Sequence, residues 1–273
     1  MNSITSILRW KLEISTFGFM KLNHKIFGEG DDTLIILHGL LGSLDNWQSL
    51  AMRFSKKRRV ITVDQRNHGK SPHDGGLSYE LMAADLKELM DDLNIDKAII
   101  LGHSMGGKTV MQFAFEYPDS VEDLIVVDMN PSESVPHHQF IFDGLGSIDL
   151  STLKTRGAAD EHMKKYVSDP GVRMFLLKNL DRTKDGFAWK VNLEAIINNY
   201  LNILAGITDG QMYTGKALFI RGAKSNYILD PDIDDILELF PIAKLETIEN
   251  AGHWLHAEQP EQFYNIVESY LSE

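Results

Sequence analysis

The chain has 273 residues, a formal net charge of −12 and no cysteine. The length suits one large α/β domain with an insertion, and 43% hydrophobic with 24% charged residues is typical of a soluble globular protein. The acidic balance argues against nucleic acid as a partner, because phosphates need clustered Lys and Arg. The lack of cysteine excludes disulfides, thiolate catalysis and Cys-ligated zinc, and we expect a cytoplasmic protein. No apolar run reaches 18 residues, so no membrane-spanning helix is predicted.

From Met20 onward, short apolar segments alternate with amphipathic helices. Residues 1–19 lack the charged-then-apolar order of a signal peptide, and we expect a poorly packed N-terminal extension there. In residues 79–93 the apolar side chains recur with a period near 3.6, which predicts a helix. Apolar strands separated by helices predict a mostly parallel central sheet flanked by helices on both faces. Strands are expected at residues 21–27, 33–37, 60–64, 98–102, 123–127, 217–221 and 244–248.

The alternation breaks between about residues 131 and 213. This stretch has helical patterns and few β-branched runs, and strand–helix alternation resumes at residue 215. We therefore expect a helical cap at 131–213, inserted after the sixth strand or so, over a core made of 20–130 and 214–273. Open α/β sheets bind ligands at their carboxyl edge, so the cap should cover the site.

The most informative motif is Gly-His-Ser-Met-Gly at residues 102–106. It follows the apolar run 98–101 and precedes the helix-like segment 108–114. A serine at the apex of a strand–turn–helix, with glycines two residues to either side, is typical of a nucleophile elbow. The pattern alone is weak, and its context makes Ser104 the candidate nucleophile.

A serine nucleophile needs a general base and a site for the developing oxyanion. His253 lies just past the last predicted strand, at the sheet edge expected for Ser104, and is the candidate base. The amide of Met105, directly after the nucleophile, is one candidate oxyanion donor. The second is the amide of Leu40, in the glycine-rich loop that follows residues 33–37.

The acid that orients the histidine is harder to assign. Its usual place is the turn after the penultimate strand, where Ser225 stands instead of an aspartate. Two carboxylates remain as candidates. Asp128 ends the strand that follows the nucleophile helix, and Asp230 lies further along the loop of Ser225. We favour Asp128, because it ends a buried strand next in order to that of Ser104.

Four aromatic side chains near the motifs are candidates for the substrate site. We expect His38 and His103 to orient backbone and water without titrating, and Trp47 and Trp254 to wall the entrance. His256 is expected to pack against or cap the final helix.

Other polar clusters favour structural roles. The segment 64–71 contains Asp64 and Arg66 but lacks the spacing of a phosphate-binding loop, so we expect an Asp–Arg pair holding a tight turn. The pair His137-His138 is expected to face solvent. No metal site is predicted, because no HExxH motif or His/Asp cluster at ligand spacing occurs.

Together the motifs resemble the α/β-hydrolase superfamily over almost the whole chain from Met20. The sequences HGLLGSxxNW, DxRxHGxS, GHSMGGK, VVDMNP and AGHW follow one another in the order of that superfamily. GHSMGGK, VVDMNP and RGAKSNY are similar to small bacterial esterases related to ABHD-eleven-type hydrolases. The resemblance implies that Asp128 is the acid and that Ser225 is usual at its position. It also implies hydrolysis of short acyl esters, with acyl-CoA thioesters accepted by some members.

We therefore predict a cofactor-free serine esterase (EC 3.1.1 type) that cleaves short- to medium-chain acyl esters through an acyl-enzyme. The main alternative is an acyl-CoA thioesterase, which would need cations near the pocket mouth; Lys108 lies too far inside its helix to serve. A receptor that uses the same residues only to hold a ligand is a third possibility. The cap side chains expected around the acyl pocket are Phe140, Phe142, Leu145, Phe175, Trp189 and Tyr200.

Overall fold

The computed structural model describes residues 20–207 and 212–273, so the expected N-terminal extension lies outside the described residues. In this part of the chain, seven strands form one sheet in the order β1-β3-β2-β4-β5-β8-β9. Only β1 runs antiparallel to its neighbour, which confirms the mostly parallel sheet. The strands are β1 (His24–Phe27), β2 (Thr33–Leu37), β3 (Arg59–Val63), β4 (Ala98–His103), β5 (Val121–Val127), β8 (Ala217–Gly222) and β9 (Lys244–Ile248).

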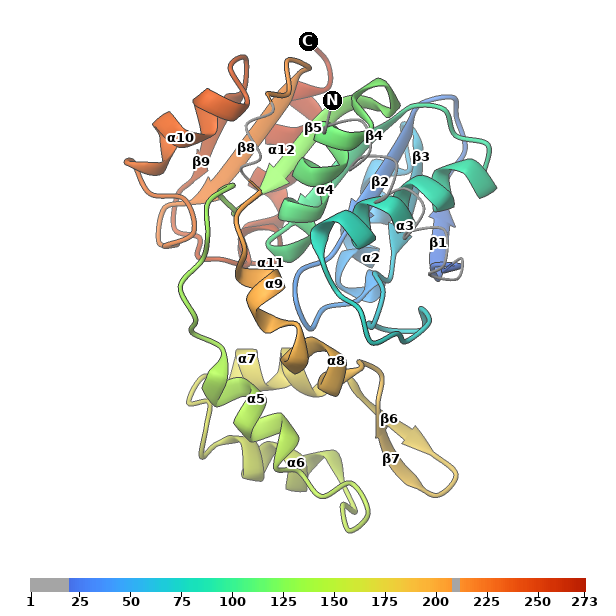
Figure 1. Cartoon of the computed structure of the whole chain (residues 1–273), viewed down its shortest axis with the longest axis vertical. Coiled ribbons are helices and arrows are strands. Elements are labelled where there is room, and N and C mark those ends of the chain that lie inside the picture. Colours follow the sequence, from blue (N-terminus) through green and yellow to red (C-terminus); the bar gives the residue numbers. More distant parts are fainter. Residues whose placement is uncertain (1–19, 208–211) are drawn as a thin grey trace, which may run out of the picture.

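Helices cover both faces of the sheet (Figure 1). One face packs on α3 and α4, and the opposite face packs on α2, α11 and α12. The interior strand β2 is buried at all five positions, as expected for a parallel strand covered on both sides. The helices of the core are α2 (Gln48–Phe54), α3 (Tyr79–Asp92), α4 (Met105–Glu116), α10 (Asp232–Leu239), α11 (Leu255–Glu258) and α12 (Pro260–Tyr270), with 3-10 turns η1 (Leu44–Trp47) and η2 (Pro118–Ser120).

The segment between β5 and β8 extends away from the sheet (Figure 1). It follows the fifth strand, one earlier than expected, and it is not purely helical. A short antiparallel hairpin, β6 (Leu180–Thr183) and β7 (Gly186–Trp189), interrupts the helices. Four-residue strands with mixed exposure carry little alternation, so the sequence pattern did not indicate them. The helices are α5 (Gln139–Gly146), α6 (Arg156–Met163), α7 (Pro170–Leu177), α8 (Leu193–Asn198) and α9 (Tyr200–Leu204).

The loop after β3 is held differently from the predicted Asp–Arg pair. The carboxylate of Asp64 accepts hydrogen bonds from the amides of Leu44 (2.8 Å) and Lys70 (2.9 Å). Arg66 instead pairs with Asp85 of α3 through two hydrogen bonds of 2.6 and 2.7 Å. The predicted pair is therefore wrong, because each partner finds a closer buried group on a different element.

The turn between β4 and α4 depends on the absence of side chains at its two glycines. A Cβ at Gly102 would lie 2.1 Å from the carbonyl oxygen of Gly106, and one at Gly106 would lie 2.7 Å from the carbonyl oxygens of Leu37 and His38. Ser104 at the apex has φ 55° and ψ −119°, a conformation that costs about 1–3 kcal/mol in a non-glycine residue. Close packing of β4, α4 and β2 therefore imposes the elbow.

Replacement of Gly102 by alanine tests this constraint. We expect Gly102→Ala to lower the free energy of unfolding by about 3 kcal/mol or more, because the contact is with backbone that cannot move aside. Gly146→Ala, at the end of α5 with no atom within 4 Å of the added Cβ, should change it by less than about 1 kcal/mol. Equal stability of the two variants in urea denaturation would contradict the steric account.

Candidate functional site

The candidate catalytic residues follow three different strands and lie at the carboxyl edge of the sheet. Ser104 follows β4, Asp128 follows β5 and His253 lies in the loop after β9. β4 and β5 are neighbours, and β8 and β9 are the next strands along the sheet. Because parallel strands end at the same edge, residues far apart in sequence come together there.

Asp128 and His253 are in direct contact. His253 Nδ1 donates to Asp128 Oδ2 at 2.7 Å. The other candidate acid, Asp230, is exposed and pairs with Arg221 at 2.7 Å. The described structure therefore brings Asp128, and not Asp230, to the histidine.

The carboxylate of Asp128 is fully buried and receives two further hydrogen bonds. The amide of Gly222 donates to Oδ1 (3.1 Å), and the hydroxyl of Ser225 donates to Oδ2. Burial raises the pKa of the Asp128 carboxyl, and the bonds from Ser225 and Gly222 oppose this rise. Ser225 stands where an aspartate was expected from the sequence. In the structure its hydroxyl donates to Asp128, which follows the neighbouring strand β5.

Ser104 lies at the floor of a cavity of about 910 Å³ that is also lined by His253. No hydrogen bond joins the Ser104 hydroxyl to the imidazole in residues 20–207 and 212–273. Such bonds are often long before substrate binds, so the shared cavity is the informative observation. Burial disfavours a charged His253, while the adjacent Asp128 carboxylate favours one.

The loop after β2 presents Leu40 to the same cavity as Ser104. His38 shapes this loop: its Nδ1 donates to the carbonyl of Gly39 (2.8 Å), since its Nε2 accepts from the amide of Gln65 (3.1 Å). Within the described residues, neither the Leu40 amide nor the Met105 amide has a hydrogen-bond partner. Of the two, Leu40 lines the cavity and Met105 does not; Met105 begins α4 directly after Ser104, the position expected of an oxyanion-hole donor.

The predicted aromatic residues take different positions around the cavity. His38, Trp47, His103 and Trp254 all line it. Trp47 is only 1% exposed and stacks on His256 at 4.2 Å between ring centroids, so it lies inside and does not wall an entrance. Burial lowers the pKa of His38 and His103, which keeps both imidazoles neutral. His103 Nε2 contacts the carbonyl oxygen of His253 at 2.8 Å.

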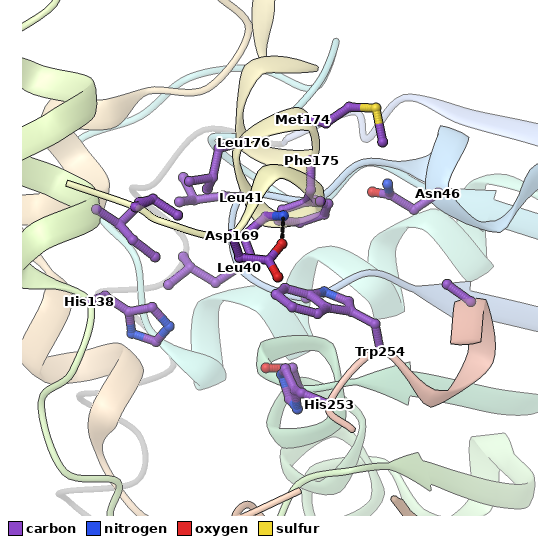
Figure 2. Close-up of a pocket in the computed structure, with 18 of the residues that line it drawn as sticks. Leu40, Leu41, Asn46, His138, Asp169, Met174, Phe175, Leu176, His253 and Trp254 are labelled. Carbon is purple, nitrogen blue, oxygen red and sulfur yellow. Dashed lines mark hydrogen bonds between the residues drawn. The ribbon is translucent and has the colours of Figure 1, made fainter. Parts of the chain in front are cut away.

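The segment 131–213 contributes apolar side chains to the cavity. Figure 2 shows Trp254 between His253 and a cluster formed by Leu40, Leu41, Phe175 and Leu176. Of the six cap residues expected there, only Phe140 and Phe175 line the cavity. Phe142 and Leu145 are buried in the same hydrophobic cluster as one face of the sheet, and Trp189 and Tyr200 do not line the cavity.

The prediction that His137 and His138 face solvent is only partly correct. His138 is partly buried and its Nδ1 lies 2.8 Å from the hydroxyl of Tyr200. His137 is exposed, but its Nε2 is hydrogen-bonded to the hydroxyl of Tyr227 at 2.7 Å. The ring of Tyr227 stacks on His253 with 3.8 Å between centroids. No local pattern indicated these contacts, because they join different segments of the chain, two of them separated by 62 and 90 residues.

The part of the chain that the structure describes contains no group of three or more His, Cys, Asp or Glu side chains placed to hold a metal. In the same residues, no helix combines the length and apolar character needed to cross a membrane.

A nucleophile elbow, a buried Asp–His pair and two free amides at the carboxyl edge of a mostly parallel sheet define an α/β-hydrolase. A family model described as alpha/beta hydrolase fold matches residues 32–260, and the chain belongs to this family. A solved esterase from a marine microorganism is 44% identical, with a TM-score of 0.90 over 92% of this chain and 99% of that one.

Two curated relatives narrow the class. The sn-1-specific diacylglycerol lipase ABHD11 of Danio rerio is 38% identical over 92% of this chain and 83% of its own. The esterase YbfF of Escherichia coli K12 is 37% identical over 88% and 93%, respectively. The chain is thus a carboxylic ester hydrolase of the serine hydrolase type, in the group of ABHD11 and the related bacterial esterases, and it acts on small-molecule esters.

Single substitutions of Asp128 and Asp230 by asparagine test which of the two carboxylates orients His253. Asp128→Asn should lower kcat by about 100- to 10,000-fold, because the amide no longer holds the imidazole in the correct tautomer. Asp230→Asn, which loses only an exposed ion pair, should stay within about twofold of the wild type. A crippling Asp230→Asn with a mild Asp128→Asn would reverse the assignment.

We expect the Ser225 hydroxyl to affect activity through its hydrogen bond to Asp128. Ser225→Ala removes a hydrogen bond that favours the ionised carboxylate, so the pKa of Asp128 should rise further. We expect roughly tenfold lower kcat/KM and an acid limb of the pH profile moved to higher pH. Ser151→Ala, which removes an exposed hydroxyl that donates to Asp149, is the matched control. A Ser225→Ala profile that keeps the wild-type acid limb would show that the hydroxyl has no such role.

Proposed function

We propose that Ser104, His253 and Asp128 form the catalytic triad of this esterase. His253 would take the Ser104 proton as the hydroxyl attacks the ester carbonyl, and the amides of Leu40 and Met105 would stabilise the oxyanion. The 2.7 Å contact between His253 and Asp128, beside the elbow of Ser104, carries this proposal. Water activated by His253 would then release the acid from the acyl-enzyme, so the reaction needs no cofactor or metal.

We propose short- to medium-chain acyl esters as substrates. The cavity of about 910 Å³ is within the range of small-molecule sites, and apolar side chains from the core and the segment 131–213 form much of its lining. We assign this segment as a cap on the core of residues 20–130 and 214–273. Because the Danio rerio relative is named for diacylglycerol, a diacylglycerol belongs among the esters to test.

Charge around the cavity favours esters over acyl-CoA thioesters. Among the described lining residues, Lys178 is the one Lys or Arg, and the carboxylates of Asp169 and Glu258 accompany it. The phosphates of CoA would require a more cationic mouth. Lys108 cannot supply this charge, since its side chain is fully buried. The cysteine-free composition is compatible with the proposed cytoplasmic location, and the acidic charge supports the absence of a nucleic-acid partner.

Pre-steady-state kinetics test the proposal. With a p-nitrophenyl acyl ester, the wild type should release a burst of p-nitrophenol equal to the enzyme concentration if deacylation is slower than acylation. Ser104→Ala should retain at most the residual rate of binding and the oxyanion hole, a loss of about 10⁶-fold in kcat. A folded wild type without turnover on esters of two to sixteen carbons would favour the ligand-binding receptor. Faster turnover of acyl-CoA than of any ester would favour the thioesterase.

A further inference from the structure

Lys108 is a buried cation that the proposed reaction does not use. It lies one turn after Ser104 on α4 and its side chain is 0% exposed. In the described residues no carboxylate lies within ion-pair distance of its ammonium group. A buried ammonium is costly unless its protons are bonded, so the acceptors around it need an explanation.

All acceptors of the Lys108 ammonium come from two chain segments. Nζ donates to the carbonyl oxygens of Ser132 (2.8 Å) and Ala205 (2.7 Å). It lies slightly further from the carbonyl oxygen of Leu204 (3.2 Å) and the hydroxyl of Ser134 (3.3 Å). One ammonium group therefore joins the segment before α5 to the segment after α9.

These two segments, which we call the hinge, are 131–134, where the chain enters the proposed cap, and 204–207, at the end of α9. Two backbone hydrogen bonds of 2.8 and 2.9 Å pair them side by side. Gly206 permits their close approach, since a Cβ there would lie 3.0 Å from the amide nitrogen of Glu133. The hinge is thus a pair of closely spaced backbone segments with Lys108 bonded to both.

The first turn of α4 is bonded both to Ser104 and to the hinge. The amide of Lys108 donates to the carbonyl oxygen of Ser104 at 3.1 Å, while the cap beyond the hinge supplies one side of the substrate cavity. We propose that Lys108 is a positioning residue that fixes the cap wall of the acyl pocket relative to the nucleophile. This inference rests on the proposed function, because it takes Ser104 as the nucleophile.

The surroundings of Lys108 favour a geometric role over a stabilising one. Burial lowers the pKa of Lys108 to about 8, and the charge of Glu133 only partly opposes this. The ring of Tyr79 lies 5.9 Å from the ammonium, and its hydroxyl donates to the carbonyl oxygen of Ile203 at 2.6 Å. An apolar side chain of similar volume would avoid the cost of a buried charge, but it would bond neither segment of the hinge.

Replacement of Lys108 by methionine should change the preference for acyl length. With p-nitrophenyl acetate, whose acyl group reaches little of the cap, kcat/KM of Lys108→Met should stay within about threefold of the wild type. With p-nitrophenyl octanoate, KM should rise by about tenfold or more, since misplacement by 1 Å can cost up to ~100-fold. Lys97→Met, at an exposed lysine, is the control and should change neither. Equal losses on both esters would overturn the proposal.

A second measurement uses the wild type, so it tests the role of Lys108 even if Lys108→Met does not fold. Ser104 is phosphonylated with p-nitrophenyl octylphosphonate or methylphosphonate, and lysines are then acetylated with acetic anhydride and quantified by mass spectrometry. An octyl chain in the pocket should hold the cap and lower acetylation of Lys108 about fivefold or more relative to the methyl adduct. Acetylation of Lys97 should be equal in both adducts.

The two failures can be told apart. If neither phosphonate modifies Ser104, the proposed function is contradicted. If both modify Ser104 and Lys108 is acetylated equally in the two adducts, only the role of Lys108 is overturned.

Discussion

The fully buried carboxylate of Asp128 constrains the rest of the site. A carboxylate without water must have each oxygen bonded, and here the donors come from three places in the chain. Gly222 donates its amide from the end of β8, Ser225 its hydroxyl from the following loop, and His253 its ring from the loop after β9. These requirements fix the relative positions of β5, β8 and β9 at the edge where Ser104 emerges. The arrangement that satisfies the carboxylate also orients the imidazole.

Steric contact sets the backbone conformation of the nucleophile, whose amide also donates to the carbonyl oxygen of Val127 at 3.0 Å. Gly102 and Gly106 allow α4 to approach β2 so closely that Ser104 is forced to a positive φ. The strain is maintained by a well-packed core, since β2 and β4 are buried along their whole length. The loop of Leu40 is set by the same packing. The serine and the candidate oxyanion donors are thus organised before any substrate arrives, which is the condition for electrostatic stabilisation of a transition state.

The sequence predicted the features that depend on local pattern. The sheet strands lie within a few residues of their expected positions because a buried parallel strand is an apolar run with turn residues at its ends. The place of Ser104, His253 and Asp128 at one edge follows from strand order alone. The cap was less predictable. Its hairpin at residues 180–189 is too short for a clear period, and four of the six expected lining residues do not line the cavity.

Apart from the contact between His253 and Asp128, contacts between distant polar groups were not predicted. The stack of Tyr227 on His253, the bond of Asn179 to the carbonyl oxygen of Leu41 (2.6 Å) and the hinge contacts of Lys108 each join segments far apart in sequence. None of these residues has a spacing that distinguishes it from an ordinary surface residue. Ser225 was noticed only because an acid was expected at its position, and its bond to Asp128 depends on the pairing of β5 with β8.

The division of the site between core and cap has a chemical consequence. The candidate triad and the Leu40 amide belong to strand ends and loops of the proposed core and the Met105 amide begins α4, whereas the proposed cap supplies an apolar wall that includes Phe140, Met174 and Phe175. Binding energy from that wall acts on a part of the substrate remote from the ester, and it helps catalysis only if the reacting carbonyl is placed correctly. The position of the proposed cap relative to α4, which begins directly after Ser104, must therefore be fixed. Asn179 holds the loop of Leu40 from the cap side, and Lys108 holds the hinge from the core side. Chain-length preference can then change through the cap while the geometry of the reacting groups stays constant.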